Sequence, residues 1–280
     1  MSAVAQLDQT AAAYDRLAPY YDEFTCGYAH AEWVAAIERR AVKLGLRGRR
    51  AIDIACGTGK STAALLALGY SVRACDISAG MVLEAQQKLP SYAEAFFVAD
   101  MRELPPLGEF DFVLCLDDAI NYLLSDDELA TTFSGAAALL SPSGVFAFDV
   151  NSIQTYRTSF AQTLVREGDG LFFAWRGEGA ATAAPGQLAS AMVETFAERA
   201  DGLWERSSSR HVQRHHRQDV VRAELARAGL ECCAVAGQLA GARLEPAVDE
   251  DRQIKLVYFA RRADRHSESE EVSRVHIISP

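Results

Sequence analysis

A short loop with two glycines, placed between an apolar run and the start of a helix, is the part of this chain best suited to hold a ligand. Residues 51–62 read AIDIACGTGKST, and the glycines are Gly57 and Gly59. Glycine lets a ligand lie against the backbone, and the first turn of a helix offers unpaired amide groups to a polar or anionic partner. Three kinds of ligand-binding loop share this design, and their glycine spacing separates them.

Two of these kinds fit the spacing poorly. A Walker phosphate loop requires G-x-x-x-x-G-K-[ST], but Ile54 stands where its first glycine belongs, so residues 59–61 supply only the second half. A dinucleotide fingerprint requires G-x-G-x-x-G, and Thr62 replaces its third glycine. The sequence therefore disfavours both a phosphate loop and a dinucleotide site.

The third kind fits. Residues 53–59, DIACGTG, closely resemble the first motif of class I S-adenosylmethionine-dependent methyltransferases, in the variant where alanine replaces the first glycine of D-x-G-x-G-x-G. The resemblance implies S-adenosylmethionine as the cofactor and a Rossmann-like sheet. It assigns these loop residues to cofactor binding: Ala55, Cys56, Gly57, Thr58 and Gly59.

Positions further along the chain match in the order that this family requires. Asp76 follows the first loop glycine by 19 residues and ends the second apolar run, where a carboxylate can accept hydrogen bonds from both ribose hydroxyls. Met81 lies a helical turn later and is placed to pack on the adenine. In the resembled family the position of Asp100 binds the adenine amino group and that of Met101 the ring face. The remaining expected cofactor residues are Ile77 and Leu116.

The loop after the fourth apolar run, residues 117–123, is the expected place of the acceptor. Methyl transfer from a sulfonium is an in-line displacement, and much of its catalysis comes from holding the nucleophile against the methyl group in a dry cleft. A hydroxyl acceptor usually needs a base, whereas an amine must be neutral. This segment resembles the corresponding loop of small-molecule methyltransferases, including amino-sugar N-methyltransferases, and the resemblance places Tyr122 near the acceptor. An aspartate here can orient an ammonium or accept a proton. The candidate catalytic residues are Tyr122, Asn121 and Asp118, with Asp117 as a substrate residue.

Two other segments are expected to close the site. Residues 14–22, YDRLAPYYD, resemble the leading helices of the same subgroup, in which phenols such as Tyr14 and Tyr21 reach the methionine end of the cofactor; ordinary packing of these tyrosines is the alternative. The predicted insertion, residues 152–216, supplies three further substrate candidates, which are Trp175, Arg176 and His211. No metal site is predicted, because histidines four residues apart on a strand lie about 13 Å from each other.

Short apolar runs alternate with stretches of helical period between residues 49 and 150, which indicates a parallel sheet with helical crossovers. Helices are expected upstream at 10–22 and 29–44, and period-two stretches facing each other across residues 201–202 predict an antiparallel insertion. We expect an α/β fold with a seven-stranded methyltransferase sheet whose last strand is antiparallel. The predicted units are an N-terminal helical cap (1–48), a cofactor-binding core (49–151 and 217–261), an antiparallel β insertion as substrate lid (152–216) and a mobile tail (262–280).

Composition narrows the classes of partner. The 280 residues carry a net charge of −10, whereas a protein that neutralises many phosphates is normally basic, so neither nucleic acid nor an anionic membrane is an expected partner. There is no run of about 18 apolar residues and no secretory signal. The six cysteines form no C-x-x-C pair and indicate reduced thiols in a cytoplasmic protein. A homodimer is compatible with the sequence.

Together these features predict an enzyme that methylates N or O of a small-molecule metabolite, as in bacterial specialised metabolism. Two alternatives stay open. The same pocket would run a lyase, cyclase or aminocarboxypropyl transfer reaction that releases methylthioadenosine, or it would belong to a non-catalytic S-adenosylmethionine-binding module. Fold and cofactor site alone do not separate these chemistries.

Overall fold

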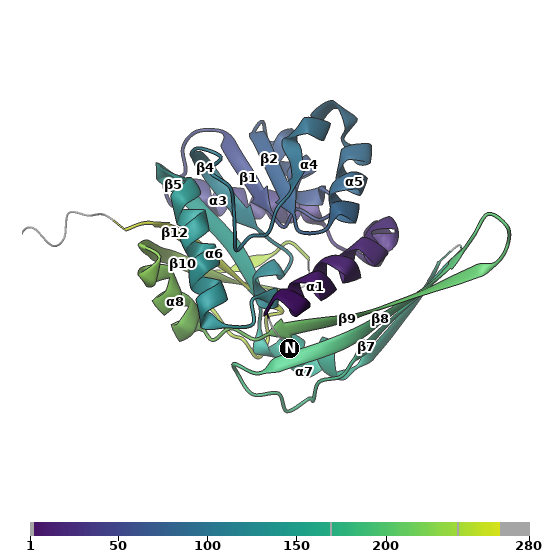
Figure 1. Ribbon diagram of the computed structural model, residues 1–280. Helices are drawn as coiled ribbons and strands as arrows, with labels where there is room; N and C mark the ends of the chain where they lie inside the picture. Colours follow the sequence, from purple (N-terminus) through teal and green to yellow (C-terminus); the bar gives the residue numbers. More distant parts are fainter. Residues whose placement is uncertain (1–2, 169, 240, 264–280) are drawn as a thin grey trace, which may run out of the picture.

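The computed structural model describes residues 3–168, 170–239 and 241–263. Its central sheet has the strand order β11-β10-β12-β5-β4-β1-β2-β3 (Figure 1). The pairs from β3 to β5 are parallel, whereas β12 runs antiparallel to both β5 and β10. The strands of this sheet are β1 (Arg50–Ile54), β2 (Ser71–Asp76), β3 (Phe96–Val98), β4 (Phe110–Cys115), β5 (Leu140–Asn151), β10 (Leu230–Gln238), β11 (Leu244–Glu245) and β12 (Lys255–Arg262).

This arrangement confirms the predicted fold class. The sheet is mostly parallel with one long antiparallel strand, and it has one strand more than the seven expected. The extra strand, β11, spans two residues that pair with the end of β10, and two residues are too short to leave a periodic signal in the sequence. The predicted mobile tail lies, from residue 264 onward, outside the described residues.

Helices cover both faces of the central sheet, because its inner strands are apolar on both sides. Phe112 and Leu114 of β4 belong to the core under α3 and α4. Val113 and Cys115, which alternate with them, belong to the core under α6 and α8. The helices are α1 (Ala3–Leu17), α2 (Tyr21–Phe24), α3 (His30–Lys43), α4 (Lys60–Ala67), α5 (Ala79–Lys88), α6 (Asp126–Leu139), α7 (Ile153–Thr158) and α8 (Gln218–Arg227), with 3-10 turns at Ala18–Tyr20, Pro90–Ala95, Ala119–Tyr122 and Ser159–Ala161. None of the described helices is long and apolar enough to cross a membrane.

The helix starts next to the site are set by local side chains. Ser125 accepts a hydrogen bond from the Glu128 amide at 3.2 Å, and the Glu128 carboxylate in turn accepts from the Ser125 amide. This capping box fixes where α6 begins, so the loop before it has a defined end. Ser78 caps α5 by accepting a hydrogen bond from the Met81 amide at 3.0 Å.

The N-terminal segment is more broken than its pattern suggests. The predicted helix over 10–22 instead ends at Leu17, continues as a 3-10 turn that contains Pro19, and resumes as α2. Proline lacks an amide hydrogen and disfavours helical geometry in the residue before it, which explains the break. Helix α1 contacts both α5 and β9, so it lies between the central sheet and the insertion (Figure 1).

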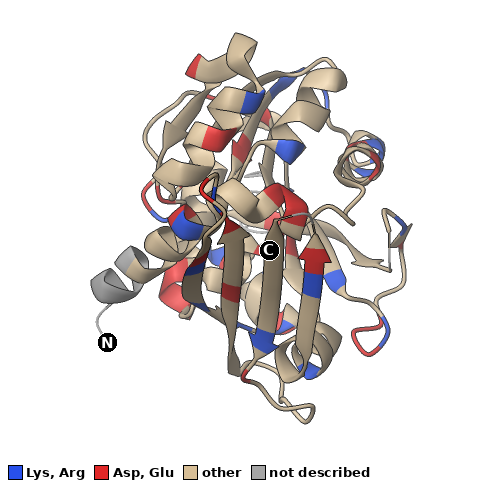
Figure 2. Cartoon of the chain, turned by 90° about the vertical axis from the view of Figure 1, so that its right-hand side faces the viewer, with Lys and Arg blue, Asp and Glu red and all other residues tan. Residues whose placement is uncertain are grey.

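The insertion is a separate antiparallel sheet in the order β6-β7-β8-β9. Its strands are β6 (Thr163–Gly168), β7 (Leu171–Gly177), β8 (Leu188–Glu198) and β9 (Trp204–Arg214). The turn between β8 and β9 contains Gly202 with a φ of 78°, as a tight hairpin requires, and the hairpin projects well beyond the body of the protein in Figure 1. Alternate residues of β8 are buried, whereas Glu194 on the other face pairs with arginines. In the view of Figure 2, acidic and basic residues are interspersed on helices and strands.

Candidate functional site

The loop that follows β1, residues 55–59, has a backbone conformation with positive φ angles, which glycine favours. Ala55, Gly57 and Gly59 have φ values of 57°, 53° and 82°, all in the left-handed region. Because Ala55 has a Cβ, it holds backbone strain of about 1 kcal/mol at the position where the commoner motif has glycine. Gly59 does not line the cavity; a Cβ there would lie 3.2 Å from the Ala85 Cβ, so this glycine lets the loop pack on α5.

Asp76 joins the loop to the start of α5. Its Oδ2 accepts a hydrogen bond from the Gly57 amide at 2.8 Å, and its Oδ1 accepts one from the Ser78 amide at 2.9 Å. Burial raises the pKa of this carboxyl to about 6 even though these amides favour the ionised form. A buried carboxylate with lone pairs remaining at the mouth of the loop is therefore available to hydroxyl groups of a ligand.

A cavity opens above the loop, at the ends of β1, β2 and β4. Most of the predicted cofactor residues line it: Tyr14, Tyr21, Ala55, Cys56, Gly57, Thr58, Asp76, Ile77, Met81, Met101 and Leu116. A smaller adjoining hollow contains Asp100 beside Met101. Arg102 binds the Asp100 carboxylate at 2.9 Å and also reaches Glu128 at 2.8 Å, so the orientation of Asp100 is fixed.

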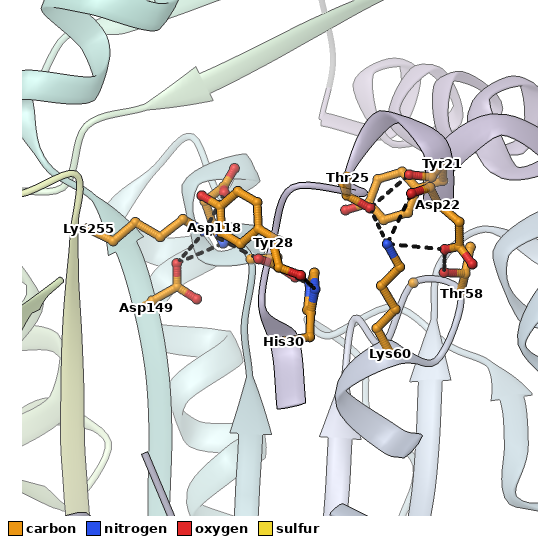
Figure 3. Close-up of polar contacts among 12 residues, drawn as sticks. Tyr21, Asp22, Thr25, Tyr28, His30, Thr58, Lys60, Asp118, Asp149 and Lys255 are labelled. Carbon is orange, nitrogen blue, oxygen red and sulfur yellow. Dashed lines mark hydrogen bonds and ion pairs between the residues drawn. The ribbon is translucent and has the colours of Figure 1, made fainter. Parts of the chain in front are cut away.

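The N-terminal segment is fastened over this cavity by polar contacts (Figure 3). Thr58 of the loop donates to Asp22 at 2.5 Å, and the Lys60 ammonium donates to the Thr25 hydroxyl at 2.6 Å. The ring of Tyr21 lies against the loop, 3.7 Å from where a Cβ on Gly57 would stand. Helices α1 and α2 therefore close the cavity from above.

A second cavity of about 290 Å³ lies between the first one and the insertion sheet. Both cavities share four lining residues, which are Tyr14, Tyr21, Asp117 and Tyr122. Phe24 and Phe173 stack with ring centroids 4.2 Å apart on the wall of the second cavity, next to Trp175. Asp118 and His211 line it as well. The two cavities therefore meet at a junction with two phenols on α1 and α2 and a third on the loop after β4.

A chain of hydrogen bonds crosses this junction. The Tyr14 hydroxyl donates to that of Tyr122 at 2.8 Å, Tyr122 lies 2.9 Å from His211 Nδ1, and His211 Nε2 lies 3.0 Å from the Ser209 hydroxyl. Burial lowers the pKa of His211 to about 4 and raises the pKa of both tyrosines, so all three rings are neutral at pH 7. Since the Tyr14 hydroxyl donates to Tyr122, the Tyr14 oxygen keeps its lone pairs.

Known proteins resemble this chain in sequence and in fold. A family model described as "Methyltransferase domain" matches residues 51–144. The putative methyltransferase YqeM of Bacillus subtilis (strain 168) is 35% identical over 141 residues, which are 50% of this chain and 56% of that protein. The chain thus spans little more than half the length of such curated relatives.

Solved structures extend the likeness to most of the chain. An S-adenosylmethionine-dependent methyltransferase from Clostridium acetobutylicum ATCC 824 covers 90% of this chain and 99% of its own, with a TM-score of 0.74 and 21% identity. The sugar N-methyltransferase KedS8 from Streptoalloteichus sp ATCC 53650 covers 86% and 92%, with a TM-score of 0.64 and 28% identity. Residues 51–144 form a methyltransferase domain. The fold over most of the chain is that of S-adenosylmethionine-dependent methyltransferases.

Two residues that the sequence assigns to the acceptor site, Arg176 and Asn121, line neither cavity. Arg176 points to the outer face of the insertion, 3.4 Å from Glu194, because it alternates with the cavity-lining Trp175 along β7. Asn121 is fully buried and lines neither cavity; its amide donates to the Arg214 carbonyl at 2.8 Å and its oxygen accepts from the Asn151 amide at 2.8 Å. Asn121 therefore holds the loop after β4 to β5 and β9.

Sequence reasoning missed a buried ion cluster at the second cavity (Figure 3). The Lys255 ammonium lies 2.7 Å from Asp118, 2.9 Å from Asp149 and 3.6 Å from Asp117. Asp117 and Asp118 have φ values of 59° and 53°, an uncommon conformation for two successive residues other than glycine, and it aims both carboxylates at the cluster. Two features of the sequence could have indicated this cluster. Lys255 begins one apolar strand, and Asp149 lies inside another.

Acidic groups outnumber the ammonium in this cluster. Burial works against the charge of Lys255, but the pKa of its ammonium is still raised by Asp118 and Asp149. Burial alone would raise the pKa of Asp117, yet Lys255 and His30 lower it to about 2. Burial raises the pKa of Asp149 to about 6, so at pH 7 it is mostly ionised. Three carboxylates face one ammonium and the His30 ring, whose Nε2 lies 2.7 Å from Asp117, so a negative excess remains at the wall of the second cavity even when His30 is charged.

Proposed function

We propose that this protein transfers the methyl group of S-adenosylmethionine to an amine nitrogen of a small-molecule metabolite. One observation carries the proposal: the cofactor cavity and the second cavity meet at Tyr14, Tyr21, Asp117 and Tyr122. An acceptor in the second cavity would face the cofactor there, in surroundings from which most water is excluded. Holding two reactants in such a geometry supplies much of the rate of a displacement reaction.

The chain offers a partner for each part of the cofactor, and the residues present therefore fit it. In this proposal Asp76 accepts hydrogen bonds from the ribose hydroxyls, and Asp100 binds the adenine amino group. Met81 and Met101 cover the adenine faces, and Tyr21 lies at the methionine end. Residues 1–48 cap the cofactor held by the core (49–151 and 217–261), and the insertion (152–216) covers the acceptor.

Protonation at the junction favours an amine over a hydroxyl. A hydroxyl acceptor needs a base. With a pKa of about 4, His211 is a weak base, and Asp117, with a pKa of about 2, is weaker still. The tyrosines keep their protons because burial raises their pKa. Asp118 is engaged by Lys255 and by Gln213, which donates at 2.6 Å. An amine has its own lone pair once it is neutral.

Charge at the junction disfavours a carboxylate acceptor. The excess of Asp117, Asp118 and Asp149 over Lys255 repels an anion and attracts an ammonium. Relatives point the same way, since a sugar N-methyltransferase is 28% identical to this chain over 86% of its length. The acceptor we propose therefore arrives as an ammonium, releases one proton to solvent water, and reacts as the neutral amine.

The cofactor supplies an electrophilic methyl group on a sulfonium. The acidic excess attracts the amine to the junction. The Tyr14 oxygen, whose own proton forms the hydrogen bond to Tyr122, can accept an N–H hydrogen bond and turn the nitrogen lone pair toward the methyl group. The N–C bond forms as the S–C bond breaks, and the electron pair of that bond stays on sulfur. The aromatic wall of Phe24, Phe173 and Trp175 keeps water away from the nucleophile.

The proposal is tested by incubating the purified protein with S-adenosylmethionine and a pooled metabolite extract. S-adenosylhomocysteine together with an amine heavier by one methylene is the expected result. Methylthioadenosine would contradict methyl transfer and indicate attack on the aminocarboxypropyl side. Cofactor binding with no turnover in any extract would indicate a non-catalytic binding module.

A further inference from the structure

The second cavity is electrically asymmetric between its buried end and its opening. The buried end carries the acidic excess around Lys255, whose side chain is 4% exposed. The exposed part of the lining comes from the edge strand β6 and from Gly27, next to Arg166, whereas Tyr28 lies at the Lys255 end, with its ring centroid 5.8 Å from Nζ. From β6, Leu164 and Arg166 line the cavity, two residues apart and so on the same face of the strand. A cation on the exposed strand β6 and carboxylates around the buried Lys255 therefore line the same cavity.

Arg166 differs from the other arginines of the insertion sheet. Arg176, Arg206, Arg210 and Arg214 of β7 and β9 each have a carboxylate within 4.0 Å. Arg166 has none among the residues that the structure describes; its Nη1 donates to the Phe24 carbonyl at 3.0 Å and lies 3.8 Å from the Cys26 sulfur. These neutral contacts hold the guanidinium beside the opening and leave its charge uncompensated. A guanidinium in this state binds carboxylate or phosphate oxygens in paired hydrogen bonds.

The wall between the two ends is apolar. Phe24 and Phe173 stack there, Trp175 lies parallel to Phe24 with centroids 6.4 Å apart, and Leu164 leaves half of its surface exposed at the opening. Flat aromatic surfaces favour a flat or apolar ligand over a strongly hydrated one. The lining of the cavity thus includes carboxylates, an aromatic wall and a guanidinium.

We infer that the acceptor is an amine joined through a flat apolar body to an anionic group, and that Arg166 selects it by binding that anionic group at the opening of the cavity. This inference rests on the proposed amine methylation and deepens it. The amine reaches the junction at Asp117, the body lies against the aromatic wall formed by Phe24, Phe173 and Trp175, and the carboxylate or phosphate stays at the partly hydrated opening. Arg166 is a specificity-determining residue here and takes no part in the displacement itself.

The test compares matched ligands that differ only in the remote charge. Binding of 4-(aminomethyl)benzoate and of 4-(aminomethyl)benzamide is measured by calorimetry at low salt, with the protein saturated with S-adenosylhomocysteine; homologues with one or two extra methylenes vary the span. The proteins are the wild type, Arg166→Gln, and the control Arg176→Gln, which removes an arginine from the outer face of the adjacent strand. For the wild type and for the control, we expect at least one acid to bind about tenfold more tightly than the matching amide. In Arg166→Gln the acid and the amide should bind equally well.

Two results would overturn the contact with Arg166. One is equal affinity for every acid and amide pair, including the absence of binding by all of them. The other is a preference for the acid that persists in Arg166→Gln. A second measurement separates this inference from the proposed function. Each acid and each amide is incubated with the protein and S-adenosylmethionine, and methyl transfer is measured as the S-adenosylhomocysteine formed. Transfer without preference for the acid would contradict the role of Arg166 alone, whereas Arg166-dependent binding without transfer to any amine would support the anion contact and contradict amine methylation.

Discussion

Replacing Lys255 by methionine removes the ammonium that faces three carboxyl groups while keeping a side chain of similar length. Its Nζ lies 2.7 Å from Asp118 and 2.9 Å from Asp149, and Asp149 is fully buried. Removing one partner of a buried ion pair costs about 3–5 kcal/mol, because the opposite charge stays buried without compensation. We expect the free energy of unfolding to fall by about 3 kcal/mol or more at about pH 8.

The loss should shrink as the pH falls. Burial raises the pKa of Asp149 to about 6 in the presence of Lys255, whereas an aspartate in an unfolded chain titrates near 3.9. A folded pKa above the unfolded one means that the folded state takes up protons first, so this contribution to stability is present at low pH and is lost as the pH rises through the folded pKa. Without the ammonium the folded pKa rises further, so the variant regains more stability on acidification than the wild type.

Urea denaturation followed by circular dichroism, at about pH 8 and about pH 5.5, measures both effects. Lys88→Met is the matched control, because Lys88 pairs with Asp22 at a site about one third exposed, where an ion pair contributes less than about 1 kcal/mol. A Lys255→Met loss no larger than that of the control would refute the electrostatic reasoning. So would a loss of equal size at both pH values.

Three further variants test the rest of the site. Asp76→Ala should weaken S-adenosylmethionine binding by about 1–3 kcal/mol in calorimetry, since buried hydrogen bonds are lost; an unchanged dissociation constant would exclude the ribose contact. Tyr122→Phe breaks the hydrogen-bond chain at the junction and should lower kcat by about tenfold to a hundredfold with little change in cofactor affinity; an unchanged kcat would show that the chain does not position the acceptor. Asn121→Ala should lower the free energy of unfolding by about 1–3 kcal/mol, because the Arg214 carbonyl and the Asn151 amide lose their partner; a change only in acceptor KM, with stability intact, would return Asn121 to the acceptor site.

Features set by neighbours along the chain could be predicted from the sequence. The strand, glycine loop and helix around residues 51–62 form a local unit, and the cap of α6 needs only Ser125 and Glu128, which lie three residues apart. The β8–β9 hairpin follows from a turn and two alternating strands. In each case a short stretch contains the whole physical cause, so its pattern is sufficient.

Features that depend on contacts between distant segments could not be predicted. Lys255 meets Asp118 across 137 residues of chain, and neither residue carries a pattern that names the other. Trp175 and Arg176 were assigned to one pocket, but only the register of β7 decides which of two adjacent residues faces inward. Asn121 lies in a segment that does border the acceptor cavity, yet its amide is used to hold that segment in place.

The measurement that tests the central claim most directly uses S-adenosylmethionine with a trideuterated methyl group. The purified protein is incubated with this cofactor and a pool of small amines, alcohols and carboxylic acids, and the products are identified by mass spectrometry and fragmentation. Amine methylation predicts a trideuteromethyl group on nitrogen with matching S-adenosylhomocysteine. Label on oxygen alone, or methylthioadenosine without any labelled product, would contradict the account.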